Sequence, residues 1–108
     1  MPNGADKNWV RLRAAINGFR LRHGHWPTQI RLHPVSLANL RDHVFEQGVF
    51  RQIEQRLTFV PDDKAGMVAQ DASGAEYNYG TEGFPPTRPD VDAREWLGNP
   101  RLNPQMEE

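Results

Sequence analysis

The stretch MVAQDASGAEYNY, residues Met67–Tyr79, indicates the fold class of this chain. Two short runs of strand-forming residues flank a turn that contains Asp71 and Gly74, the residue types that short hairpin connections use. We therefore expect a β-hairpin in which Met67–Asp71 pairs with Glu76–Tyr79.

The residues before this hairpin alternate between helical and strand-like patterns. Apolar residues at helical spacing predict a helix over 7–23, and alternating polarity predicts strands over 28–33 and 57–60. Two more helical segments separate these strands. The order α-β-α-α-β-β-β predicts an α+β fold: a small two-layer domain with a mostly antiparallel sheet of three or four strands and two or three helices on one face.

The residues after the hairpin differ in composition. Residues 84–108 contain five prolines and form the expected Pro-rich tail, with one short helix near 91–97 that begins after Asp90. We expect residues 1–83 to form a single domain and the tail to pack on it.

Length and composition limit the classes of protein to consider. A chain of 108 residues has the size of one domain, and 37% hydrophobic residues predict a modest core. Cysteine is absent, which excludes disulfides and thiolate metal sites. The polar residues 1–8 lack a signal-peptide core, and no apolar run reaches the roughly 18 residues of a membrane span. We expect a soluble, cytoplasmic protein that is not bound to a membrane.

Charge is unevenly distributed along the chain. Residues 1–60 contain nine Lys and Arg and four acids, hence +5, whereas residues 61–108 contain four Lys and Arg and ten acids, hence −6. Such asymmetry indicates either a basic binding surface beside an acidic tail or two halves that neutralise each other after folding.

The basic half raises the alternative of nucleic-acid binding through Arg11, Arg22 and Arg31. Phosphate binding requires positive charge gathered on one face. On a helical wheel, Arg13 and Arg20 lie on one flank of the first helix, and Arg11 and Arg22 lie on the other. Two separate rows of arginine weaken this alternative.

The same wheel places Val10, Ala14 and Leu21 together, opposite the main apolar stripe of the helix. A helix that is apolar on two faces is usually covered on both. The cover would be the tail, a protein partner or a second copy of this chain.

The aromatic residues after the turn extend this candidate partner-binding surface. Tyr77 and Tyr79 are two residues apart, so an extended strand would place both on one face. Phe84 and Trp96 follow in the tail, and tyrosine or tryptophan side chains offer large contact area with a polar tip. The alternative is that both tyrosines pack against a helix inside the domain.

Catalytic and metal-binding patterns are weak. His23, His25 and His33 define a second alternative, a metal-dependent hydrolase, but no helical His pair at four-residue spacing occurs. The two serines have structural interpretations, Ser36 as a helix cap and Ser73 as a turn residue. We expect no cofactor and no catalytic residue, and we interpret the chain as a small interaction or regulatory module that binds a protein partner or forms a homodimer.

Overall fold

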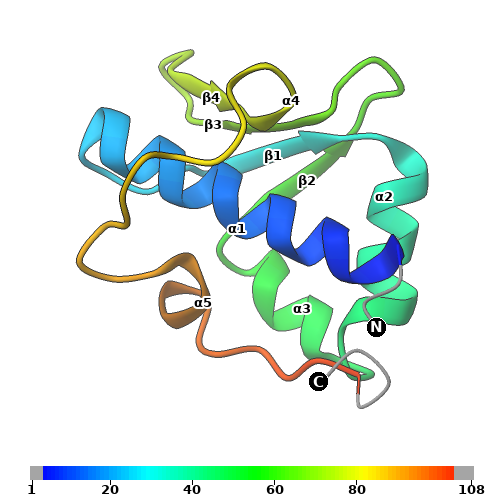
Figure 1. Cartoon of the computed structure of the whole chain (residues 1–108). Helices are drawn as coiled ribbons and strands as arrows, with labels where there is room; N and C mark the ends of the chain where they lie inside the picture. The colour runs from blue at the N-terminus through cyan, green and yellow to red at the C-terminus, as the bar shows by residue number, and fades with distance from the viewer. Residues whose placement is uncertain (1–3, 104–108) are drawn as a thin grey trace.

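The computed structural model describes residues 4–103 and, within the first helix, the side chains from Lys7 onward. These residues form five α-helices, one π-helical segment and four strands (Figure 1). The elements are α1 (Gly4–His23), β1 (Gln29–Leu32), α2 (Pro34–Asn39), η1 (Leu40–Val44), α3 (Val49–Glu54), β2 (Thr58–Pro61), β3 (Met67–Gln70), β4 (Glu76–Asn78), α4 (Tyr79–Glu82) and α5 (Ala93–Trp96). The chain therefore has the predicted α+β class; residues 104–108 of the predicted tail lie outside the described residues.

The four strands form one sheet in the order β2-β1-β3-β4. β1 and β2 are parallel, with Ile30 opposite Phe59, and the other two neighbouring pairs are antiparallel. The mostly antiparallel sheet is confirmed, including the hairpin of β3 and β4, whose turn places Gly74 at a φ of +94°. Parallel strands need a long connection, and α2, η1 and α3 supply it.

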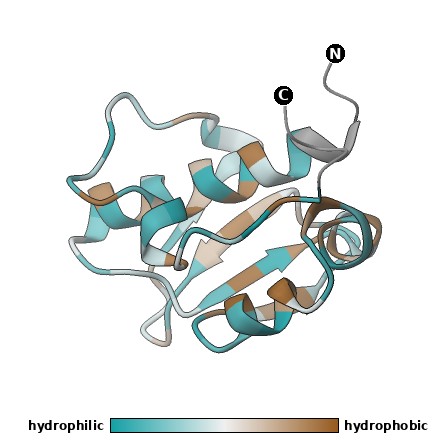
Figure 2. Cartoon of the chain, turned by 90° about the horizontal axis from the view of Figure 1, so that it is seen from below, coloured by the Kyte–Doolittle hydropathy of each residue, from teal (hydrophilic) through white to brown (hydrophobic). Residues whose placement is uncertain are grey.

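α1 packs along the sheet, where its main apolar stripe enters the core (Figure 1). Leu12, Ile16 and Phe19 are fully buried together with residues of β1 and β3. Figure 2 shows hydrophobic stretches on the central strands and mostly hydrophilic or neutral outer loops. Gly18 permits a close contact between α1 and the sheet, because a Cβ there would lie 2.5 Å from the ring of Tyr77.

Two local predictions are wrong by a few residues. Tyr79 does not continue the strand of Tyr77, because β4 ends at Asn78, whose side-chain oxygen accepts a 2.8 Å hydrogen bond from the Gly80 amide and caps α4. Ser36 does not cap α2, because the helix begins at Pro34. The Nδ1 atom of His33 accepts the hydrogen bond from the Val35 amide instead.

The tail helix also begins later than expected. α5 covers Ala93–Trp96, and the carboxylate of Asp92, rather than Asp90, accepts the 2.8 Å hydrogen bond from the Arg94 amide. Ala93 and Leu97 are buried in the same core cluster as α1 and the sheet. In addition, the rings of Trp26 and Trp96 stack with centroids 4.6 Å apart and planes 6° apart.

None of the described helices is long and apolar enough to cross a membrane.

Candidate functional site

Ion pairs between the two halves of the chain neutralise part of their opposite net charges. Three ion pairs among the described residues join an arginine before residue 60 to an acid after it: Arg13–Asp92, Arg22–Glu82 and Arg31–Asp62. The imidazole of His25 also contacts the Asp71 carboxylate, and this contact is an ion pair only when His25 is protonated. Of the two explanations that the sequence left open, mutual neutralisation accounts for these residues.

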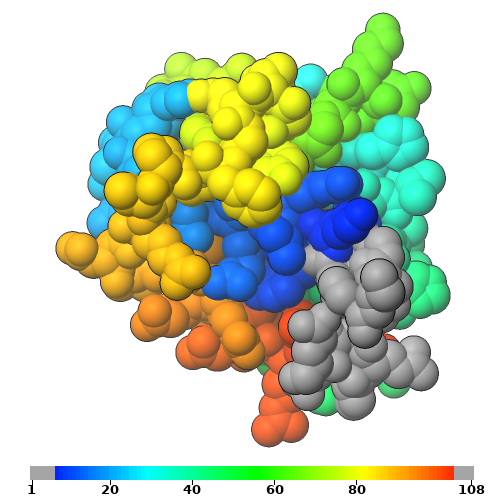
Figure 3. Space-filling view, viewed as in Figure 1, coloured from blue at the N-terminus to red at the C-terminus, as the bar shows by residue number. Residues whose placement is uncertain are grey.

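The outer face of α1 borders a groove of about 320 Å³, which we call the α1 groove. Val10, Arg13, Ala14 and Asn17 form the helical side, and residues 84–88 together with Asp92 form the other side. Figure 3 shows the yellow-to-orange part of the chain beside the blue outer face of α1. The groove volume lies at the lower end of the range of roughly 300–1,000 Å³ that is typical of ligand pockets.

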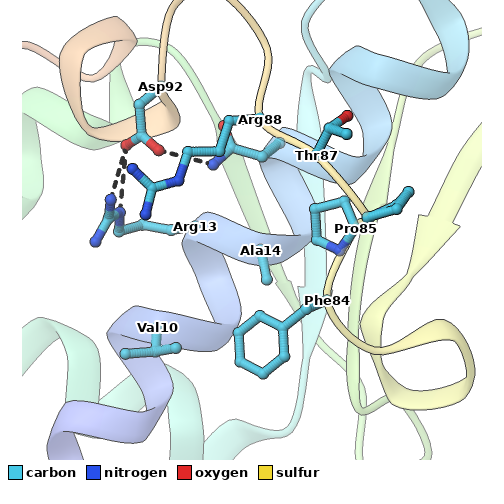
Figure 4. Close-up of a pocket in the computed structure, with 10 residues that line it drawn as sticks. Val10, Arg13, Ala14, Phe84, Pro85, Thr87, Arg88 and Asp92 are labelled. Atoms are coloured by element: carbon cyan, nitrogen blue, oxygen red, sulfur yellow. Dashed lines mark hydrogen bonds and ion pairs between the residues drawn. The ribbon is translucent and has the colours of Figure 1, made fainter.

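One end of the α1 groove is apolar. Figure 4 shows Phe84 at this end with Val10 and Ala14. Phe84 is 62% exposed and Val10 is 41% exposed, whereas Ala14 is buried. The Phe84 ring is supported on one side by Tyr79 in an edge-to-face arrangement with centroids 5.4 Å apart. A large aromatic side chain is thus held in place with most of its surface in solvent.

The other end of the groove contains a polar network centred on Asp92. Its Oδ2 atom accepts hydrogen bonds from the Arg13 side chain at 3.1 and 3.3 Å, and its Oδ1 atom accepts one from Asn17 at 2.9 Å (Figure 4). The Asn17 side-chain oxygen accepts the Ala93 amide hydrogen bond at 2.8 Å. These contacts hold the start of α5 against α1.

The pKa of Asp92 lies below its ordinary value. Partial burial acts to raise this pKa, but hydrogen bonds from the Arg94 amide and the Asn17 side chain, together with the charge of Arg13, outweigh it. Asp92 is therefore an ionised structural group whose charge is already balanced within the fold.

Arg88 is the second cation of the groove and differs from Arg13. Its side chain is exposed, and within the part of the chain that the structure describes it makes no hydrogen bond or ion pair. Its charge is available to a bound molecule.

The structure brings together part of the predicted partner-binding set. Val10, Ala14 and Phe84 line the α1 groove, and Leu21 lies further along the same face of α1, 39% exposed. The remaining aromatic residues have other surroundings. Tyr77 is buried and donates a 2.8 Å hydrogen bond from its hydroxyl group to the Gly83 carbonyl, and the ring of Trp96 stacks on Trp26.

The residues of the nucleic-acid alternative do not gather at one place. Arg22 pairs with Glu82 and lies over the Tyr77 ring, and Arg31 pairs with Asp62. Only Arg11 of the three has no ion pair among the described residues. Two of the three charges are thus engaged within the fold.

The three histidines of the metal alternative are divided between two places. His23 at the end of α1 and His25 just after it lie close together, with ring centroids 6.3 Å apart, whereas His33 lies beyond the opposite end of β1, at the start of α2. Among the side chains that the structure describes, no group of three His, Asp or Glu residues is placed to hold a metal ion. The Nε2 atom of His25 instead contacts Asp71 at 2.6 Å.

Sequence reasoning missed the polar half of the groove, formed by Arg13, Asn17, Arg88 and Asp92. One signal was present: Asn17 falls between Ala14 and Leu21 on the second face of the helix, where a polar residue interrupts an apolar strip. No pattern in the sequence connects that position to Asp92, because the two are 75 residues apart.

No family model, curated protein or solved structure matches this chain.

Proposed function

We propose that this chain is a non-catalytic binding module that holds a segment of another protein, or of a second copy of itself, in the α1 groove. The observation that carries the proposal is the exposure of Phe84, 62% exposed above a helical strip that includes Val10. Burying a phenylalanine side chain contributes about 1.5–3 kcal/mol, so an exposed and supported ring is an energetic anchor for a partner.

The chemistry of the groove supports binding rather than catalysis. Its side chains carry alkyl, aromatic, guanidinium, amide and carboxylate groups and the hydroxyl group of Thr87, and its one carboxylate accepts hydrogen bonds from Arg13, Asn17 and the Arg94 amide. A general base must be free to take a proton from a substrate. Asp92 is engaged in holding α5, which favours a structural role.

Exchange of a single exposed side chain tests the proposal. Phe84→Asp introduces a charge into the apolar end of the groove, and Val35→Asp is the matched control because Val35 is 71% exposed on α2, away from the groove. We expect the immobilised wild-type chain and Val35→Asp to retain the same protein from extract of the source cells, and Phe84→Asp to lose it.

Native mass spectrometry of the three purified chains covers the case of a second copy. Self-association that is lost in Phe84→Asp and kept in Val35→Asp supports the α1 groove as the contact. If the two variants behave alike in both measurements, the groove is not an interaction site and the proposal is wrong.

A further inference from the structure

We propose that the occupant of the α1 groove is an acidic protein segment that carries one large apolar side chain. This inference rests on the proposed function and adds the chemistry of the partner. The apolar side chain would contact Phe84 and Val10, and a neighbouring carboxylate would pair with Arg88.

The apolar end of the groove determines the first requirement. Phe84 and Val10 are both exposed there, and Ala14 on the next turn of α1 adds only a small, buried side chain (Figure 4). The groove of about 320 Å³ holds a few side chains rather than a folded domain. One apolar side chain inserted at this end would remove the exposed surface of Phe84 from water.

The charges around the groove determine the second requirement. Two of its lining residues are arginines, and its single lining acid, Asp92, is already paired with Arg13. Lys7 and Arg11 are exposed and stand three residues before Val10 and Ala14, so they lie next to the apolar strip on the helix surface. Neither makes an ion pair among the described residues, and neither does Arg88. Asp90, exposed two residues after Arg88, is the one acid nearby in the chain that is likewise without an ion pair among the described residues. The three unpaired cations outnumber it, so the surroundings of the groove are complementary to negative charge.

A nucleic acid fits these features less well than an acidic protein segment. Phosphate binding depends on many cations along a track, yet Arg13 and Arg22 of the same helix are neutralised by Asp92 and Glu82. The end of the groove formed by Val10 and Phe84 is apolar and offers no group to bind a phosphate.

The wall of the groove also indicates how the segment would bind. Pro85 and Pro86 follow Phe84 and have no amide hydrogen to donate. A partner strand cannot receive hydrogen bonds from this part of the wall, so recognition through strand addition is disfavoured. The groove would therefore recognise the segment through its side chains.

Selection from a display library of random 12-residue peptides tests the partner chemistry directly. The full chain is the target, and peptides that also bind Phe84→Asp are removed. We expect the enriched peptides to carry a net negative charge and at least one Leu, Phe, Met or Trp. Enrichment of basic or uncharged sequences, or of no sequence at all, overturns the inference.

Single substitutions then test the roles of the two ends with one enriched peptide. Arg88→Gln should weaken binding about five- to tenfold, as expected for the loss of one charge-assisted hydrogen bond, and raised salt should reduce the difference. Arg51→Gln is the matched control, because Arg51 is exposed on α3 outside the groove. Equal affinity of the two variants contradicts the role of Arg88.

A single-stranded polyuridylate RNA serves as the competing ligand. If it displaces the peptide at lower concentration than unlabelled peptide does, the groove binds nucleic acid and the inference is wrong. If selection fails but Phe84→Asp still loses a protein that Val35→Asp retains, the binding module stands and only the acidic partner is excluded. If the selection enriches no acidic peptide and Phe84→Asp retains the same proteins as Val35→Asp, both the acidic partner and the binding module are excluded.

Discussion

Gly18 is the residue at which helix propensity and tertiary packing oppose each other. Alanine is the better helix former by about 1 kcal/mol. A Cβ at this position would lie 2.5 Å from two ring atoms of Tyr77, and overpacking of this kind typically costs about 1–3 kcal/mol. We expect Gly18→Ala to lower the free energy of unfolding, measured by urea denaturation, by about 1 kcal/mol.

The control for this prediction removes the ring. In a Tyr77→Leu background the added methyl group finds space, so the same Gly18→Ala change should be neutral or stabilising there. A stabilising effect of Gly18→Ala in the wild-type chain would contradict the close contact between α1 and β4.

Asn17 is the residue that joins α1 to the start of α5. Its side chain is buried in the chain interior, and its amide group forms hydrogen bonds with the Asp92 carboxylate and the Ala93 backbone. We expect Asn17→Ala to lower the free energy of unfolding by about 1–3 kcal/mol, because the buried Ala93 amide and the partly buried Asp92 carboxylate each lose a partner. Thr87→Ala, an exposed change at the same groove, should have almost no effect in the same denaturation measurement.

At the scale of elements, two residues of the segment after β4 are expected to behave in opposite ways. Leu97 is buried beside α5 in the core cluster, whereas Phe84 is mostly exposed. Leu97→Ala should lower the free energy of unfolding by about 2–5 kcal/mol. Phe84→Ala should change it by less than about 0.5 kcal/mol, the usual effect of a surface change.

Urea denaturation of the two variants measures both values. A large loss of stability in Phe84→Ala would mean that this ring supports the fold, and it would remove the main reason for assigning it to a partner.

The elements themselves were predictable where the pattern is local. Alternating residues predict β1 and the β3–β4 hairpin, and Gly74 and Asp71 predict its turn, because each signal lies within a few residues. Helix ends were less predictable. His33 is not a usual cap, and only the observed bond from its Nδ1 atom to the Val35 amide shows why α2 begins at Pro34 rather than after Ser36.

The relation between elements was not predictable from the sequence. Nothing in Gln29–Leu32 or Thr58–Pro61 specifies that these strands lie parallel, because the register depends on how α2, η1 and α3 fill the connection. The same reason explains the groove. The helical wheel of α1 predicted the apolar residues on the helical side of the groove. The positions of Arg88 and Asp92 could not be predicted, because they depend on the path of the chain after β4.

At the scale of the whole molecule, ion pairs between the two halves make stability depend on pH. Hydrogen bonds from the side chains of Ser73 and His25 hold the pKa of Asp71 well below its ordinary value, and hydrogen bonds from arginine lower the pKa of Asp62 and Glu82. Below about pH 4 the unfolded chain takes up protons that the folded chain resists. The stabilisation is therefore complete above about pH 5 and is lost as pH falls.

We expect the thermal midpoint of the wild-type chain to fall between pH 5 and pH 3. Asp71→Asn should flatten this dependence, because one of the groups with a lowered pKa is removed. Asp63→Asn is the matched control, since Asp63 is exposed and makes no hydrogen bond or ion pair among the described residues. Equal pH dependence in the two variants would show that Asp71 does not contribute.

The central claim for the whole molecule is that its interaction surface is the α1 groove. Photo-crosslinking in the source cells tests it most directly, with p-benzoylphenylalanine placed once at Phe84 and once at Val35. We expect a discrete crosslinked product, with another protein or a second copy of this chain, from position 84 and none from position 35. No product from position 84, or the same products from both positions, would contradict it.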